Sequence, residues 1–596
     1  MIRVLGIIGI TARGFRRPSP LIALLLAVFS VPLFALSGCQ GLNDWLFEDD
    51  APPTATAPVI ESAAPTVAPS APPPGLLFGV SWSGQTDIMP LTNDNRFDAL
   101  WLPLVYEGLF QLDDTFEPQP VLCVRYETED NMTFIFKMRY GVMFHDGETL
   151  TAEDAAWSLN TAQAAGPYAA RLAGMISALA LDDYTLEVML EQPNPRLPAL
   201  LTIPIVRAGS DKNGIAPGTG PYIPDTQGNL VTPGTPEPPD DPGGTGDPGG
   251  TGDPDGPDDP ESPGGLDDPD GPDLNPSYPH LAPFTKWWQR RRMPLVRLEL
   301  ISILSGDQLI YAFESRTLSL VVYNPSDVTS VRFRGDYESW EYDTSIMEFV
   351  GFNTTRFPTS DALMRRAISA VIDRQAVGDE TSGPRPTTPA TLPLPPPSPL
   401  YDPVLAATCG YDPARTIELF AEMGYEDTDG DGMLEVTIGR RTYPLQLTMV
   451  VCAENERHVG AARHIAAALA DVGASVDLRE LPSSDYHEAL QEGVFDLYYG
   501  AASLMPDFSP LTFFEEGSLG FGGYDDPETL EKWEAAAAET TGDNAAKAFW
   551  RRFVNEMPIA PVLFQQQFLQ LQRGLTTDPR PAWENIFYHL PEWTMN

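Results

Sequence analysis

"FHDGETLTAEDAAWSLN" (residues 144–160) is the stretch that decides the fold, because it passes from the end of a strand into the start of a helix. Asp146 and Gly147 form a turn pair, since glycine readily adopts the positive φ that many turns require. Thr151 stands three residues before Asp154, which is a variant of the capping box that opens a helix. The stretch therefore predicts a strand, a tight turn and a capped helix in direct succession.

The same stretch holds a histidine and several carboxylates, which raises the question of catalysis. His145 lies at the predicted strand end, while Glu153 and Asp154 favour the positive end of a helix. Nucleophilic catalysis needs a nucleophile positioned beside a base, and no such residue accompanies them. We therefore interpret these residues as architecture and not as a catalytic site.

Other segments alternate between strand and helix periodicity. "TFIFKMR" (133–139) has the two-residue period of a strand. "AARHIAAALADVG" (461–473) has the spacing of a helix that stops at its glycine, and "SVDLREL" (475–481) follows as a strand. "ALMRRAISAVIDRQAV" (362–377) predicts one amphipathic helix. Helices and strands mixed throughout, without an obvious repeat, indicate an α/β protein of several lobes with mixed sheets.

The first forty residues have the features of an export signal. Arg13, Arg16 and Arg17 form a cationic region before "LIALLLAVFSVPLFAL" (21–36), whose length suits the core of a signal peptide better than a spanning helix. The run ends in "LSGC", which resembles the bacterial lipobox, so we predict a lipoprotein signal peptide over 1–38 and lipidation at Cys39. The alternative is a simple membrane anchor with an incidental cysteine. The Pro-rich residues 39–75 are then expected to tether the protein to the membrane.

The charge of the chain is strongly negative and unevenly spread. A formal net charge of −46 argues against a nucleic-acid partner or an anionic membrane surface. Residues 232–274 hold thirteen Asp and Glu with no Lys or Arg, and we predict a disordered acidic insertion there, with calcium binding as the weaker alternative. The basic-aromatic "KWWQRRR" (286–292) follows. A polyanion is one ligand it could take, but we favour an internal or solvated role.

Export also bears on the cysteines. With Cys39 lipidated, Cys123, Cys409 and Cys452 remain, and three cysteines form at most one disulfide within the chain. A pair between Cys409 and Cys452 is compatible with the sequence, which does not establish it. No spacing of Cys or His residues suggests a zinc site.

Several motifs resemble those of family 5 extracellular solute-binding proteins, the oligopeptide-, dipeptide- and nickel-binding components of ABC importers. The opening stretch is similar to the family's His/Asp-Gly turn followed by Leu-Thr-Ala-Glu-Asp. The resemblance covers residues 76–596, with the acidic segment as an extra insertion. The other matching motifs, in the family's order, are "VYEGLF" (105–110), "GTGPY" (218–222), "FVGFNTTRFPTSDALMRRAISAVIDRQAV" (349–377), "LPLPPPSPLYDP" (392–403), "YDPARTIELFAEMGYEDTDGDG" (411–432) and "GVFDLYYGAASLMPDFSPLTFF" (493–514).

This resemblance implies a two-lobed clam-shell of the type II periplasmic-binding-protein kind, in its large peptide-binding subclass. Hinge motion would close the lobes around an extended ligand. The implied organisation is lobe 1 over 76–320 with a subdomain near 111–215, lobe 2 over 321–555, a return to lobe 1 over 556–596, and hinge segments near 320–325 and 555–561.

The resemblance also implies ligand-binding residues. Asp507 matches the acidic position that meets a peptide's α-amino group, although a turn aspartate before Phe508 is an equal alternative. Tyr106 lies in the family's early Tyr-Glu segment, and Asn353 begins a loop of a matching stretch. Leu504 stands where many peptide binders have tryptophan, and "SRTLSLVVYN" (315–324) lacks a family aspartate, so a ligand other than a standard peptide stays open. The six histidines form no evident nickel cluster.

A separate acidic motif invites a comparison with calcium loops. Asp427, Asp429 and Asp431 have the spacing that starts an EF-hand loop, but the twelfth position is Ile438 and not a bidentate glutamate. We expect a β-turn here and keep these aspartates as a weak calcium candidate.

Together these features predict a monomeric, lipid-anchored binding protein that faces the periplasm or the extracellular space. It would capture a peptide or another small solute and deliver it to an ABC permease, with no catalysis, cofactor or nucleic acid. The alternatives are an exported hydrolase, and a binding protein repurposed as a receptor or peptide chaperone.

Overall fold

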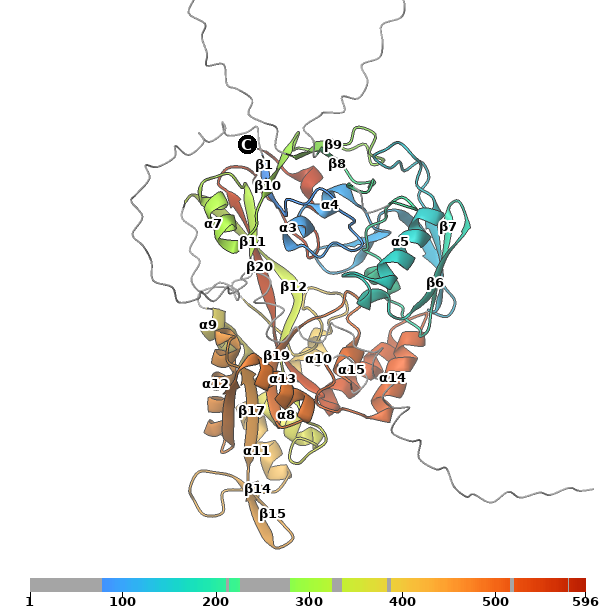
Figure 1. Ribbon diagram of the computed structural model, residues 1–596. Helices are drawn as coiled ribbons and strands as arrows, with labels where there is room; N and C mark the ends of the chain where they lie inside the picture. The colour runs from blue at the N-terminus through green and yellow to red at the C-terminus, as the bar shows by residue number, and fades with distance from the viewer. Residues whose placement is uncertain are drawn as a thin grey trace, which may run out of the picture.

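The structure is a computed structural model in which two lobes lie one above the other (Figure 1). The predicted signal peptide (1–38), the lipidation site Cys39, the tether (39–75) and the acidic insertion (232–274) lie outside the described residues. The described residues are 78–210, 214–225, 279–323, 335–382, 387–514, 519–576 and 578–595.

Lobe 1, the upper lobe in Figure 1, holds two four-stranded sheets around a shared apolar core. The strands of its first sheet are, in spatial order, β1 (Phe78–Trp82), β10 (Leu298–Ser302), β9 (His280–Pro283) and β8 (Tyr222–Asp225). β1 and β10 are parallel, whereas the other two pairs are antiparallel. Trp82 and Trp101 are buried in this core, where aromatic side chains remove much apolar surface from water.

The second sheet of lobe 1 is antiparallel, and the opening stretch (144–160) follows its strand β5 in the chain. Its spatial order is β4 (Cys123–Glu127), β5 (Thr133–Met138), β7 (Thr185–Leu190) and β6 (Met175–Asp182), and helix α5 (Ala152–Ala164) packs on β6 and β7. The backbone N–H of Thr151 donates to Asp154 Oδ2 at 2.8 Å, which is the predicted capping contact. Gly147 has a φ of 94°, so the predicted turn is confirmed as well.

Lobe 2, the lower lobe, is built on a seven-stranded mixed sheet. The sheet order is β11 (Leu320–Tyr323), β20 (Ile559–Gln572), β12 (Tyr337–Phe352), β19 (Leu497–Ser503), β17 (Gln446–Cys452) and β18 (Ser475–Leu481), with β13 (Thr388–Pro389) beside β20. The helices around it are α8 (Ala362–Ala370), α9 (Arg374–Ser382), α10 (Pro403–Ala407), α11 (Pro413–Glu422), α12 (Glu456–Asp471), α13 (Ser483–Glu492), α14 (Pro527–Ala538) and α15 (Asn544–Glu556).

Two long strands, β12 and β20, join the lobes. Tyr342 and Leu569 belong to the core of lobe 1, whereas Met347 and Phe564 belong to the core of lobe 2. The register of the pair shifts between Asp343 and Met347, which is where the strands cross from one core to the other. An irregular ladder at this point allows a sharper bend and twist than regular pairing. The hinge predicted near residues 320–325 and 555–561 stays a prediction.

Short elements complete both lobes. In lobe 1, β2 (Phe110–Leu112) and β3 (Pro118–Pro120) form a hairpin whose loop residue Phe116 packs in the core of lobe 2. At the far end of lobe 2 (Figure 1), a small sheet consists of β14 (Tyr425–Glu426), β15 (Glu435–Ile438) and β16 (Arg441–Pro444). The remaining short helices are α3 (Arg96–Ala99), α4 (Leu102–Val105), η1 (Ala170–Leu172), α6 (Leu197–Leu200), α7 (Gly306–Glu314), η2 (Pro510–Phe513) and η3 (Leu590–Glu592).

The predicted single helix over residues 362–377 is wrong, because the structure has two helices there, α8 and α9. The Arg374 side chain explains the interruption. Its Nη1 donates to the carbonyl oxygens of Ser369 and Ile372, each at 3.3 Å, so these carbonyls need not continue the helical ladder. Apolar periodicity runs on across the break, which is why the sequence did not reveal it.

The remaining expectations concern cysteines and membrane spans. Cys409 is a buried free thiol, so it does not pair with Cys452. None of the helices in the described ranges combines the length and the apolarity that a membrane crossing requires.

Candidate functional site

A cavity of about 480 Å³ opens in lobe 1 against the strands that join the lobes. Its walls come from segments far apart in the chain: the region of α3 and α4, residues 167–171, the strands β11, β12 and β20, and residues 583–586. Such apolar cavities bind ligands that bury apolar surface and are oriented by a few polar groups. The aromatic side chains in the lining are Phe97, Tyr106, Phe110, Tyr168, Tyr342 and Trp583.

Glu107 is a buried carboxylate on this cavity. It accepts hydrogen bonds from Thr219 Oγ1 at 2.9 Å and from the indole N–H groups of Trp287 and Trp288 at 3.1 and 2.9 Å. Burial raises the pKa of Glu107 to about 7, although these hydrogen bonds favour the ionised form. Both indoles come from "KWWQRRR", whose aromatic part therefore has an internal role.

Arg171 and Glu584 form an ion pair on the same cavity. The hydroxyl of Thr202 joins them, because it accepts from Arg171 Nη1 at 2.9 Å and donates to Glu584 Oε2 at 3.0 Å. Burial disfavours the charged guanidinium, yet Glu584 outweighs it and the pKa of Arg171 is raised, with Tyr168 and Asp507 acting in the same direction. The cavity thus has an oriented ion pair among its aromatic side chains.

One loop of lobe 2 touches lobe 1 near this ion pair. The side-chain amide of Asn194 donates to Asp507 Oδ2 at 2.9 Å, and the rings of Phe116 and Phe508 meet edge to face with centroids 5.6 Å apart. Burial raises the pKa of the Asp507 carboxyl, while the Asn194 amide and the charge of Arg196 oppose this shift. The lobes are therefore in contact at this point.

The structure does not bring the four predicted ligand-binding residues to one place. Tyr106 lines the cavity, and Asp507 lies at the contact between the lobes, where its carboxylate also accepts from the backbone N–H of Ser509 as a turn aspartate does. Leu504 is buried in the core of lobe 2. The amide of Asn353 donates to two backbone carbonyls of the loop that precedes β19. Leu504 and Asn353 thus support loops of lobe 2 away from the cavity lining.

Sequence reasoning missed the polar groups of the cavity. Glu107 stood within a matching motif, but nothing linked it to the tryptophans of a segment far along the chain. Arg171 and Glu584 lie in segments that carry no motif, and their contact joins distant parts of the sequence. The closeness of such residues is a property of the tertiary fold alone.

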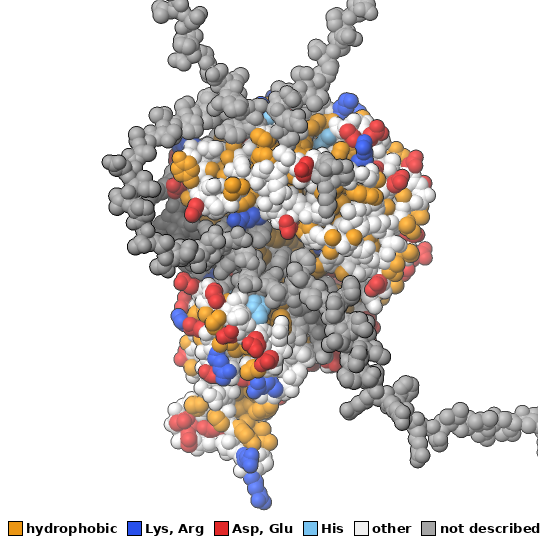
Figure 2. Space-filling model, viewed as in Figure 1, with side chains coloured by type: hydrophobic (Ala, Val, Ile, Leu, Met, Phe, Trp, Pro, Cys, Tyr) orange, Lys and Arg blue, Asp and Glu red, His pale blue; other side chains and the backbone are white. Residues whose placement is uncertain are grey.

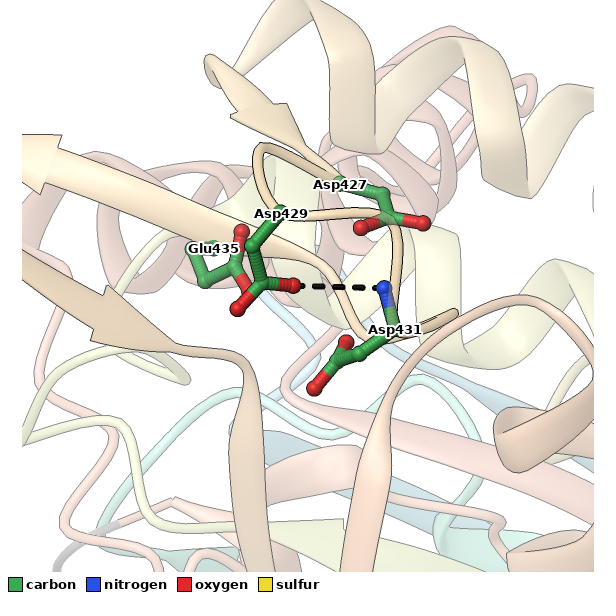
Figure 3. Close-up of side chains that lie close together, drawn as sticks. All are labelled: Asp427, Asp429, Asp431 and Glu435. Atoms are coloured by element: carbon green, nitrogen blue, oxygen red, sulfur yellow. Dashed lines mark hydrogen bonds between the residues drawn. The ribbon is translucent and has the colours of Figure 1, made fainter.

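The acidic loop at the far end of lobe 2 gathers four carboxylates (Figure 3). One oxygen each from Asp427, Asp429, Asp431 and Glu435 lies within 4.8 Å of the others. Glu435 was not among the predicted residues, because it occupies the ninth and not the twelfth position. Asp427 also accepts from backbone N–H groups of two glycines at 2.7 and 3.1 Å, which organises a turn. These contacts agree with the expected turn, and calcium binding by the three aspartates stays the weaker, untested alternative.

His145 has contacts that agree with an architectural role. Its Nε2 lies 3.0 Å from the carbonyl oxygen of Gly220, and its ring meets Phe284 edge to face. Burial lowers the pKa of His145 to about 4, so the ring is neutral at pH 7. Its neighbour Asp146 pairs with Arg207 at 2.6 Å.

The surface carries its charges in a dispersed way. On the face shown in Figure 2, the Lys and Arg side chains of the described residues lie in small separate groups among acidic and uncharged ones. A nucleic-acid surface would require these cations to be continuous.

A family comparison identifies what kind of protein carries this fold and cavity. The sequence profile described as "Bacterial extracellular solute-binding proteins, family 5 Middle" matches residues 117–229 and 274–522, which is more than half of the chain. The chain belongs to family 5 of the bacterial extracellular solute-binding proteins. Its family and fold are therefore those of solute-binding proteins and not of enzymes.

Individual relatives of this family 5 protein agree over shorter or more diverged stretches. "Uncharacterized protein YhjP" of Bacillus subtilis is 31% identical over 131 residues, which cover 21% of this chain and 23% of YhjP. The match thus spans about a quarter of that relative's length.

Solved structures resemble the family 5 protein over nearly their whole length. The substrate-binding protein CtaP from Listeria monocytogenes has a TM-score of 0.62 at 17% identity, covering 87% of this chain and 99% of CtaP. The oligopeptide-binding protein AppA from Bacillus subtilis, in complex with a nonapeptide, has a TM-score of 0.52 at 16% identity, covering 87% and 98%. The fold is therefore the two-lobed type II periplasmic-binding-protein fold with mixed sheets.

Proposed function

We propose that this protein is the substrate-binding lipoprotein of an ABC importer, which captures a peptide or a similar small solute and delivers it to a membrane permease. Family membership supports the solute-binding role, and the nonapeptide bound to AppA supports the peptide class. The "LSGC" motif supports an anchor at Cys39 on the outer side of the cytoplasmic membrane. The protein acts as a monomer and performs no chemistry on its ligand.

The observation that carries this proposal is the aromatic cavity of lobe 1, which lies against the strands between the lobes. Tyr106 and Tyr342 supply apolar surface there, and Arg171 with Glu584 supplies opposite charges on one wall. A peptide has both features that such a cavity recognises, an apolar side chain and a polar backbone with charged ends. A solute that bridges the cavity and the loop of Asp507 would be enclosed when the lobes close.

We assign the ligand's α-amino group to Asp507. Its carboxylate accepts from the neutral amide of Asn194, and burial raises its pKa. An ammonium group in this place would favour the ionised carboxylate, and a charge-assisted hydrogen bond is about twice as strong as a neutral one. The desolvation of both charges offsets part of this gain.

The experiment compares short apolar peptides with free and acetylated N-termini by isothermal titration calorimetry. Wild type should bind the free peptides at least about tenfold more tightly, which is 1.4 kcal/mol. Asp507→Asn should remove this preference, and Tyr106→Ala should weaken both forms alike. Tyr106→Phe is the matched control, because it keeps the ring and removes only the hydroxyl that bonds a backbone carbonyl.

Two results would contradict the proposal. Native mass spectrometry that finds no co-purifying solute, together with no binding of any peptide, would refute peptide capture. Equal binding of free and acetylated peptides by wild type would refute the role of Asp507 and leave the cavity intact.

A further inference from the structure

A second cavity, of about 340 Å³, lies in lobe 2 between the helices α8, α10, α11 and α15. Arg366, Arg415 and Arg551 contribute to its lining, one each from α8, α11 and α15. Thr408 and Asn555 add a hydroxyl and an amide. Three arginines thus line one small cavity in a chain that has 83 acidic and only 37 Lys and Arg residues.

Two of these arginines differ from their immediate neighbours in the chain. Arg365 and Arg552 are ion-paired, with carboxylates at 3.7 and 2.8 Å respectively. In the part of the chain that the structure describes, no carboxylate oxygen lies within 4.0 Å of Arg366 or Arg551. In each Arg-Arg pair, therefore, one side chain is ion-paired and the other lines the cavity without an ion pair to the described residues.

The third arginine is partly neutralised from outside. Arg415 lies 2.9 Å from Glu418 and 3.9 Å from Glu422, both of which are exposed on its own helix. Neither glutamate lines the cavity. The positive potential inside it comes mainly from Arg366 and Arg551.

Carbonyl groups at the C-terminal ends of α8 and α15 could in principle bind Arg366 and Arg551, but several of them already have other donors. At the end of α8, the carbonyl oxygen of Ser369 accepts from Arg374 at 3.3 Å, and that of Ala370 accepts from the backbone N–H of Asp412 at 2.8 Å. At the end of α15, two carbonyl oxygens accept from Arg365. Other groups thus donate to two carbonyl oxygens at the end of each helix.

Arg374 adds further positive charge behind the cavity wall. It is buried, and its hydrogen bonds in the described structure go to carbonyl and hydroxyl oxygens, including Ser369 Oγ at 2.9 Å. Burial lowers the pKa of Arg374 to about 10, which leaves it charged at neutral pH. Ser369 itself lines the cavity and accepts from Arg374 through its oxygen, so its hydroxyl hydrogen is oriented away from that arginine.

We propose that this cavity of lobe 2 binds a small multivalent oxyanion of the phosphate class, held by Arg366 and Arg551 with Arg415 at its side. Guanidinium groups present paired N–H donors that match the oxygens of phosphate. Arg366 is half-buried, which strengthens its attraction for an anion relative to open water, whereas Arg551 is exposed. This site lies apart from the solute cavity of lobe 1, and it binds its anion whether or not a solute is present.

The test is calorimetric titration of the full mature chain with inorganic phosphate in a chloride buffer of constant ionic strength. We expect saturable binding of one phosphate per chain. Arg366→Gln and Arg551→Gln should each weaken it by about tenfold or more, because each removes a charged hydrogen-bond donor. The matched control is Arg441→Gln, which removes the same charge from the exposed strand β16 of the same lobe.

The possible outcomes distinguish specific phosphate binding in the cavity from an unspecific attraction of phosphate to positive charge. A melting temperature that phosphate raises in wild type and Arg441→Gln, but not in the two cavity variants, would support the proposal. Both cavity residues are partly or fully exposed, so these variants should fold, and melting without phosphate checks this. Absence of saturable binding by wild type would overturn the proposal, and so would an equal loss in Arg441→Gln.

Discussion

Phe116 supplies a contact that exists only while the two lobes touch. Its side chain is 1% exposed within the core of lobe 2, although the β2–β3 hairpin that carries it belongs to lobe 1. Truncating a buried phenylalanine costs roughly 3–5 kcal/mol, and the edge-to-face pair with Phe508 accounts for about 1 kcal/mol of this. We expect Phe116→Ala to weaken the closed arrangement by about 3 kcal/mol, which lowers the closed-to-open ratio about 150-fold.

The backbone at Phe116 provides a second variant. Its φ is 63°, in the left-handed region that costs a side chain with a Cβ roughly 1 kcal/mol. Phe116→Gly removes the same ring and also relieves this cost. Both variants should therefore open the lobes, while the glycine variant should unfold at a higher urea concentration than the alanine variant.

The assay measures the distance between spin labels on the two lobes by pulsed electron paramagnetic resonance. Cysteines at the exposed positions Tyr140 and Arg441 carry the labels. Phe549→Ala is the control, because Phe549 is fully buried within lobe 2 and truncation there should lower stability without lengthening the distance. The reasoning fails if Phe116→Ala behaves like this control, with a lower melting temperature but an unchanged distance.

Three further predictions follow from charge and processing. Burial raises the folded-state pKa of Glu107 from 4.5 to about 7, so the protonated carboxyl stabilises the folded state. This stabilisation is complete below pH 4.5, and up to about 3 kcal/mol of unfolding free energy is lost as the pH rises through 7. Urea unfolding of Glu107→Gln at a series of pH values should lack this loss. Burial lowers the folded-state pKa of His145 from 6.5 to about 4, so the neutral imidazole stabilises the folded state. This stabilisation is complete above pH 6.5, and at most about 3 kcal/mol of unfolding free energy is lost as the pH falls toward 4. The stability of His145→Gln should depend less on pH in this window, and an unchanged pH profile would contradict the assigned burial. Cys39→Ala should abolish labelling of the protein by palmitate in cells, and retained label would refute the lipid anchor.

The sequence predicted those features that depend on a few neighbouring residues. The capping contact between Thr151 and Asp154, the turn at Gly147 and the helix stop at Gly473, whose φ is 90°, follow from the local preferences of these residue types. The family's motifs supplied the order of elements and hence the two-lobed fold. The break between α8 and α9 was missed, because the Arg374 side chain binds backbone carbonyls there and such a contact leaves no periodic pattern in the sequence.

The candidate site was much less predictable. The Arg171–Glu584 pair and the contact of Asn194 with Asp507 join residues that are hundreds of positions apart. Only tertiary folding creates these contacts, so neither the apolar periodicity of the sequence nor the spacing of its motifs reveals them. Tyr106 was found because it lies in a recognisable motif, whereas Arg171 and Glu584 lie in segments that carry none.

The pairing of β8 with β9 has a consequence for how this chain tolerates change. The chain leaves β8 at Asp225 and re-enters the sheet at His280, and these two residues are register partners. The two strand ends are thus held side by side by their own pairing. For a flexible loop, even a tenfold change in length alters the free energy of closure by only about 2 kcal/mol. A flexible reporter or affinity tag inserted between these two strands is therefore expected to leave their pairing intact.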